Sequence, residues 1–310
     1  MSRLVYLDQN AWVALGKGAW DKEAYPREHE ALVKVVESTT TGEYEIPLSS
    51  TNIYETSKIN DPVKRANLAR TQALISGGQV FRGRRRILRE TLTKYVAERF
   101  AVSYRLPDGQ WFLSKLWFEA VGDYDPETYG FDLPDHFLDG IRANPAWTLF
   151  KYLAFGDDGK RVESVRRYSA SSAELIERIE ARRSLSADAP FALRKRAYGA
   201  SMIIDELDFI FEIGQNLGLH WQSVGDIGSS LIRSMVVDVP IFNVERELVV
   251  RLENESRLVH ENDLRDMMAF MTVLPLADVV VAEKPFVNLA RQAKLGDVYE
   301  TKLLTNVFDL

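Results

Sequence analysis

The pattern of apolar and polar residues along the 310-residue chain predicts two kinds of region. In the first kind, short apolar runs predict strands over 3–8 (RLVYLD), 44–48 (YEIPL) and 279–281 (VVV), with another inside 298–305 (VYETKLLT). Apolar residues at helical spacing predict helices between these runs, for example over 27–39. This alternation is typical of an α/β fold, with a mostly parallel sheet flanked by helices.

The middle of the chain has a different pattern. Residues 61–237 show helical spacing without strand–helix alternation, including an amphipathic stretch over 84–100 and an acidic, loop-like stretch over 119–135. We therefore expect an α/β domain split between residues 1–60 and 238–310, with residues 61–237 forming a large helical insertion domain. Such insertions are tolerated at exposed loops whose ends lie close together.

Composition narrows the class of protein. Hydrophobic residues make up 46% and charged residues 27% of the chain, as in globular proteins. No apolar run reaches the 18 or so residues of a membrane span, and Asp8 interrupts the apolar start, so we expect a cytoplasmic protein without a membrane partner. The absence of cysteine excludes disulfides, thiolate catalysis and cysteine-ligated zinc. With a net charge of -6, nucleic acid could be bound only through a local basic patch.

Acidic residues follow three of the predicted strands. Asp8 ends the first strand, Glu55 lies one turn into the helix after the second, and Glu283 comes shortly after 279–281. Because ligand sites in α/β sheets form beyond the carboxyl ends of the strands, these side chains are candidates for one site. Taken singly, Asp8 is equally well explained as a helix N-cap and Glu55 as a solvated helical residue.

Two more carboxylates begin a predicted helix. Asp263 and Asp266 are three residues apart, so they share one helix face, with Asn262 as the expected N-cap. Two carboxylates about 4 Å apart repel by about 4 kcal/mol at an effective dielectric constant of 20. A cluster of acids therefore needs cations nearby.

The four segments VYLDQN, STNIYET, NDLRDMM and VVVAEKPF resemble, in order and context, the motifs of the PIN-domain nucleases. In that family an Asp ends the first strand, a Glu lies in an early helix, an Asp opens a later helix, and a last acid follows a strand. The resemblance covers the outer segments only. It implies a PIN-like fold in which Asp8, Glu55, Asp266 and Glu283 are catalytic and hold Mg²⁺ or Mn²⁺.

Two further acids are candidate metal ligands beside these four. Asp266 matches the family spacing better than Asp263, which either assists through a water molecule or caps the helix. Glu283 stands where Asp is commoner in the family, and Asp278 is the alternative ligand. Hard cations prefer carboxylate oxygens, and they activate water for phosphodiester hydrolysis.

The alternative is a structural or catalytically idle cluster. In that case the acids form salt bridges with cations, for which the sequence neighbours Lys17, Lys58 and Lys284 are candidates. The four histidines are too scattered to offer a zinc site instead.

A basic run in the middle region is the candidate nucleic-acid surface. The residues assigned to it, together with one lysine near the acids, are Arg82, Arg84, Arg85, Arg86 and Lys284. Solvated helix faces are the alternative explanation.

The leading hypothesis is a metal-dependent endonuclease. The PIN resemblance implies RNA rather than DNA as substrate, and a toxin or phage-defence role with an antitoxin or other protein partner or as a homodimer. Two other hypotheses are an inactive PIN-like scaffold that binds nucleic acid or protein, and a nucleotide phosphohydrolase.

Overall fold

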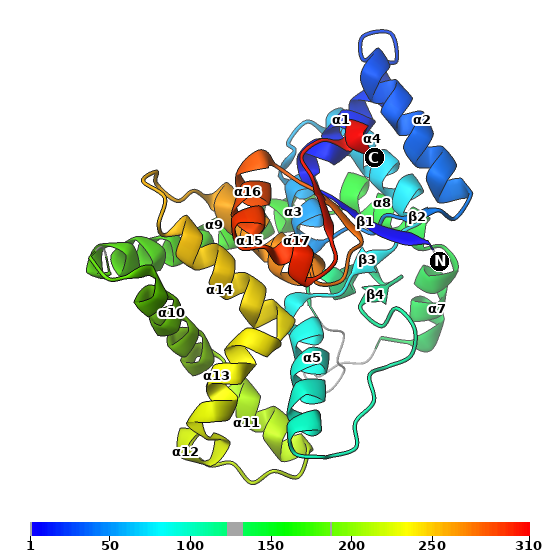
Figure 1. The fold of residues 1–310 in the computed structure, drawn as a ribbon. Coiled ribbons are helices and arrows are strands. Elements are labelled where there is room, and N and C mark those ends of the chain that lie inside the picture. Colours follow the sequence, from blue (N-terminus) through cyan, green and yellow to red (C-terminus); the bar gives the residue numbers. More distant parts are fainter. Residues whose placement is uncertain (1, 123–132, 187) are drawn as a thin grey trace.

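A small parallel sheet lies at the centre of the fold in the computed structural model, which describes residues 2–122, 133–186 and 188–310 (Figure 1). Its strands, in spatial order, are β2 (Tyr44–Glu45), β1 (Arg3–Leu7), β5 (Val279–Val281) and β6 (Lys302–Leu304). All three pairings are parallel, with Leu4 opposite Glu45 and Leu7 opposite Val281. The expected α/β class with a parallel sheet is therefore confirmed, although β2 and β6 are shorter than predicted.

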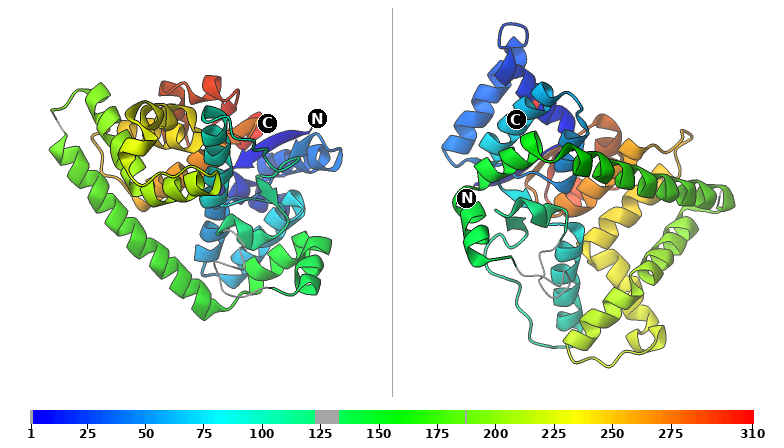
Figure 2. Two further views of the ribbon diagram at one scale, coloured as in Figure 1. Left: turned by 90° about the horizontal axis from the view of Figure 1, so that it is seen from below. Right: turned by 180° about the vertical axis from the view of Figure 1, so that it is seen from behind.

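Helices make up most of the described chain and surround this sheet. In chain order they are α1 (Gln9–Trp20), α2 (Pro26–Thr40), α3 (Ser50–Lys58), α4 (Pro62–Ser76), α5 (Arg84–Arg99), η1 (Trp117–Ala120), α7 (Asp135–Ala143), α8 (Pro145–Phe155), α9 (Asp158–Leu185), α10 (Phe191–Asp205), α11 (Leu207–Asn216), α12 (Val224–Ile227), α13 (Ser229–Asp238), α14 (Pro240–Leu252), α15 (Glu261–Val273), α16 (Lys284–Gln292), α17 (Leu295–Val298) and η2 (Val307–Asp309). The longest, α9, runs along the outside of the molecule (Figure 2).

The two faces of the sheet contact different hydrophobic cores. Successive side chains of a strand point to opposite faces, so Val5 and Leu7 pack with α1, α2, α4 and α8, whereas Leu4 and Tyr6 pack with α5, α14, α15 and α16. We call the core that contains Val5 and Leu7 the first core and the core that contains Leu4 and Tyr6 the second core. In β5, Val280 belongs to the second core, and its two neighbours belong to the first. Because helices cover both faces, the strands read as continuous apolar runs.

Many apolar residues of 61–237 belong to the two cores that flank the sheet, and a small separate cluster around Leu116, Leu138 and Ile141 lies within this region. Helices α4 and α8 share the first core with α1, and α5, α10 and α13 share the second core with α14 and α15. The middle region also contains a short antiparallel pair, β3 (Val80–Phe81) and β4 (Leu113–Ser114), and Val80 forms a parallel bridge to Leu48 beside β2. These two short strands were not predicted from the sequence.

One local expectation also changes. His260, not Asn262, is the N-cap of α15. Of the acidic stretch 119–135, residues 123–132 lie outside the described part of the chain. Within the described residues, no helix combines the length and apolar character needed to cross a membrane.

Candidate functional site

Four acidic side chains line one small cavity at the carboxyl edge of the sheet. They are Asp8, Glu55, Asp266 and Glu283, here called the acid cluster. Asp8 and Glu283 follow the neighbouring strands β1 and β5, whereas α3 supplies Glu55 and α15 supplies Asp266. The cavity volume is about 40 Å³, roughly the space of one water molecule or metal ion.

Asp8 has both roles that the sequence left open. Its Oδ1 accepts a hydrogen bond from the Ala11 N–H at 2.9 Å and so caps α1, while its own N–H donates to the Val281 carbonyl at 2.9 Å. The side chain is buried and also lines the cavity. Burial, followed by the charges of Glu283 and Glu55, raises the pKa of Asp8 to about 7, although the Ala11 hydrogen bond opposes the shift.

Asp266 is the least compensated acid of the cluster. Burial and then the charges of the other three acids, with a small effect of Asp263, raise its pKa to about 8. Among the described residues it has no hydrogen-bond or ion-pair partner, in contrast to Asp8. Asp266 lies one turn into α15, and its carboxylate faces the cavity at the edge of the sheet.

Glu55 contacts a cation that the sequence analysis did not consider. Arg265 Nε lies 2.7 Å from Glu55 Oε1, and the same guanidinium also pairs with Glu261. Burial raises the pKa of Glu55, while Arg265 and Lys58 oppose this shift. The salt-bridge alternative is thus realised for one acid of four. The sequence did contain a signal for this contact, because Arg265 directly precedes Asp266.

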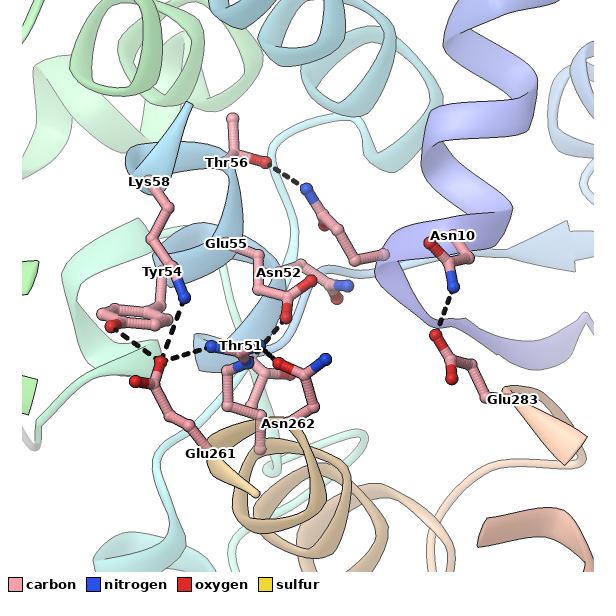
Figure 3. Close-up of polar contacts among 12 residues, drawn as sticks. Asn10, Thr51, Asn52, Tyr54, Glu55, Thr56, Lys58, Glu261, Asn262 and Glu283 are labelled. Atoms are coloured by element: carbon pink, nitrogen blue, oxygen red, sulfur yellow. Dashed lines mark hydrogen bonds and ion pairs between the residues drawn. The ribbon is translucent and has the colours of Figure 1, made fainter. Parts of the chain in front are cut away.

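Of the three lysines predicted as salt-bridge partners, Lys58 alone forms an ion pair among the described residues. It contacts Glu261 at 3.0 Å, and Tyr54 donates to the same carboxylate (Figure 3). Lys17 lies over the ring of Tyr25 instead.

Glu283 occupies the exposed side of the cavity. It is the N-cap residue of α16, and the side-chain amide of Asn10 donates to its carboxylate (Figure 3). Thr51 and Asn52 also line the cavity, and Asn52 Nδ2 donates to the Leu7 carbonyl at 3.2 Å. Sequence analysis missed these neutral residues, although Asn52 belongs to a capping box with Ser49 at the start of α3.

Two predicted metal ligands lie outside the acid cluster. Asp263 accepts two hydrogen bonds from Arg257, both at 2.7 Å, and one from the His260 N–H at 2.8 Å. Asp278 accepts from the Leu4 N–H at 2.6 Å just before β5 begins, at the opposite edge of the sheet. Asp263 therefore caps its helix, and neither acid is positioned to assist the cluster directly.

The predicted nucleic-acid-binding arginines form ion pairs with glutamates of the same chain. Their ion-pair partners are Glu119 for Arg82, Glu206 and Glu245 for Arg84, Glu206 for Arg85, and Glu90 for Arg86. These contacts connect the segment before α5 to η1, and they connect α5 to the α10–α11 junction and to α14. Lys284 is exposed at the start of α16. None of these arginines lines the cavity, and the nucleic-acid role predicted for them stays a prediction.

The cavity is lined by carboxylate, hydroxyl and amide groups, which suit a hard cation such as Mg²⁺ or Mn²⁺, and also by the guanidinium of Arg265. In the part of the chain that the structure describes, no three acidic or histidine side chains stand close enough to ligate one ion together. Magnesium sites commonly use only one or two carboxylates and retain several waters, so this spacing is compatible with such a site.

Comparisons with protein-family models, with curated proteins and with solved structures find no match to this chain. Function is therefore inferred from the chemistry of the site.

Proposed function

We propose that this protein is a Mg²⁺- or Mn²⁺-dependent phosphodiesterase, in particular an endoribonuclease with a PIN-like arrangement of its outer segments. The observation that carries this proposal is Asp266, a partly buried carboxylate with no cationic partner among the described residues, which faces three other acids. Such a group is unfavourable in a purely structural role, because charge repulsion and burial both oppose its ionisation. A bound divalent cation offsets both effects.

The residues of the acid cluster fit this cation in different ways. Asp266 and Asp8 are the expected direct ligands, since both carboxylates face the cavity and neither forms an ion pair among the described residues. Glu283 and the Glu55–Arg265 pair lie around them. When bound, a divalent cation lowers the pKa of a coordinated water and stabilises charge on phosphate oxygens.

The chain's own groups would control protons and orientation. The pKa values of about 7 and 8 for Asp8 and Asp266 mean that cation binding at neutral pH must release protons from these carboxyls. The guanidinium of Arg265 lines the same cavity and is a donor for a phosphate oxygen. The expected substrate is RNA, and the expected setting is a toxin or defence protein with a protein partner or a second copy.

A second candidate is a non-catalytic scaffold of the same fold. Arg265 favours it, because its contact with Glu55 already places one positive charge inside the acid cluster. A third candidate is a phosphohydrolase acting on free nucleotides. Because the acid cavity is small, it would hold only a phosphate group of such a substrate.

The experiment combines cleavage with metal binding. Purified protein is incubated with Mn²⁺ and labelled single-stranded RNA, single-stranded DNA or a panel of nucleotides. The Asp8→Asn variant should lose cleavage while keeping the fold, because asparagine also caps helices. Asp278→Asn is the matched control, since it changes an acid at the other edge of the sheet. Absence of any cleavage, together with a melting temperature unchanged by Mn²⁺, would remove the enzyme proposal and favour the scaffold.

A further inference from the structure

A larger groove lies next to the acid cluster. Its volume is about 560 Å³, within the range of small-molecule sites, and its lining is mainly apolar. Residues of α3, α8 and α9 form most of its walls, and Met268 of α15 contributes from the helix that carries Asp266. We call it the tyrosine groove, after Tyr54, Tyr152 and Tyr168.

The tyrosines present flat aromatic surface together with polar groups. The rings of Tyr54 and Tyr168 lie 4.0 Å apart, and Tyr152 stacks on Trp117 at 3.7 Å with 38% of its surface exposed. Within the described residues, the hydroxyls of Tyr152 and Tyr168 have no hydrogen-bond partner. Burial raises the pKa of both, that of Tyr168 to about 12, so both hydroxyls are neutral donors at physiological pH.

The groove and the acid cavity share walls. Thr51 lines both, and α3 presents Tyr54 to the groove and the next residue, Glu55, to the cavity. Polar contacts also connect them, because Tyr54 donates to Glu261 at 3.4 Å and Glu261 pairs with the same Arg265 that contacts Glu55. Figure 3 shows Tyr54, Glu55 and Glu261 gathered at this junction. A ligand in the groove would therefore adjoin a group bound in the cavity.

The rim of the groove carries positive charge. Lys160 is exposed and has no ion-pair partner among the described residues. Arg161 is held in place by the Ser57 carbonyl and by Asp158. The lining acid Asp157 is occupied as the N-cap of α9. The chemistry is thus aromatic surface, neutral hydroxyl donors and a cationic edge, a combination that suits an unpaired base and its phosphate.

We propose that the tyrosine groove holds an unpaired nucleobase of the RNA strand whose phosphodiester enters the acid cavity. This inference rests on the proposed function and adds to it a preference for single-stranded substrate. Stacking on Tyr152 or Tyr168 gives affinity with little sequence preference. The free hydroxyls contact the edge of the base, and Lys160 contacts a neighbouring phosphate.

Binding is measured without cleavage. The full chain carrying Asp8→Asn is titrated against a fluorescently labelled single-stranded RNA of five nucleotides, with anisotropy as the readout. Adding Tyr152→Ala or Tyr168→Ala should weaken binding about tenfold or more, as expected for loss of one stacked base. The corresponding changes to Phe should retain most of the affinity. Tyr25→Ala, at an exposed tyrosine outside the groove, is the control and should leave binding unchanged.

The outcomes separate this inference from the proposed function. If the alanine variants bind like Asp8→Asn alone, or if Asp8→Asn does not bind the single strand, the groove assignment is overturned whatever the nuclease assay shows. If alanine weakens binding but the wild-type chain cleaves nothing with Mn²⁺, the groove assignment stands and the proposed activity fails. A double-stranded RNA of the same sequence should compete poorly, and equal competition would overturn the requirement for an unpaired base. Melting temperatures of all variants exclude simple unfolding.

Discussion

Replacing Asp266 by asparagine directly tests the charge balance of the acid cluster. The variant keeps the shape of the side chain and removes its ionisation. In the absence of metal, the folded wild-type chain holds a proton on Asp266 up to a pKa of about 8, whereas the unfolded chain loses it near the ordinary value of 3.8. The folded state therefore binds more protons between these pH values, and its stability must fall as pH rises through this range.

The size of the effect follows from the two pKa values. At pH 7 the carboxyl lies about three pH units above its ordinary pKa, and at 1.36 kcal/mol per unit this amounts to about 4 kcal/mol at most. Asparagine does not incur this cost. For a chain of 310 residues, an unfolding entropy of about 0.65 kcal/mol/K converts the gain into a melting temperature up to about 6 °C higher.

Calorimetry at pH 5 and pH 8, with EDTA and with Mn²⁺, measures this directly. In EDTA, the wild-type melting temperature should fall between pH 5 and pH 8, and Asp266→Asn should reduce the fall. Mn²⁺ at 100 times its dissociation constant should restore about 2.7 kcal/mol to the wild-type chain at pH 8 and little to the variant.

Asp263→Asn is the matched control from the same helix. Asp263 is paired with Arg257 and caps α15, so its neutral variant should lose about 1–2 kcal/mol of stability instead of gaining it. The reasoning is refuted if Asp266→Asn is also destabilising in EDTA, or if the wild-type melting temperature does not depend on pH between 5 and 8.

Three further predictions follow from other contacts. Arg265→Ala removes the positive charge beside Glu55, so it should lower stability in EDTA and tighten Mn²⁺ binding several-fold in calorimetric titrations. Arg84→Ala leaves two partly buried glutamates without their shared cation and should cost about 3 kcal/mol in urea unfolding, with unchanged binding of the RNA probe. Gly18→Ala would place a Cβ 2.4 Å from the backbone of Glu28, so it should separate α1 from α2 and greatly lower the melting temperature.

Each of these predictions has a contrary result. Weaker Mn²⁺ binding in Arg265→Ala would mean that the arginine supports the ion instead of competing with it. If Arg84→Ala lowered the affinity for RNA without lowering stability, the arginine run would be a substrate surface. An unchanged melting temperature in Gly18→Ala would show that the two helices can move apart at little cost.

The sequence by itself determined the sheet and the meeting point of four acids. Apolar runs at 3–7 and 279–281 indicate strands that are buried on both faces, as is typical of a parallel sheet. Once they pair, Asp8 and Glu283 follow at the same edge by necessity. These are local consequences of pattern and chain direction, so they can be derived without coordinates.

Only the tertiary structure decided which charges meet. Arg265 pairs with Glu55, although 210 positions separate the two in the sequence. Asp263 pairs with Arg257, although Asp263 lies on the same helix as Asp266. Arg84 of α5 pairs with Glu206 and Glu245, both more than 100 residues distant in the sequence. Such pairings depend on how helices dock over the two faces of the sheet. Spacing along the chain specifies the face of a helix that a charge occupies, but it does not specify the partner packed against that face.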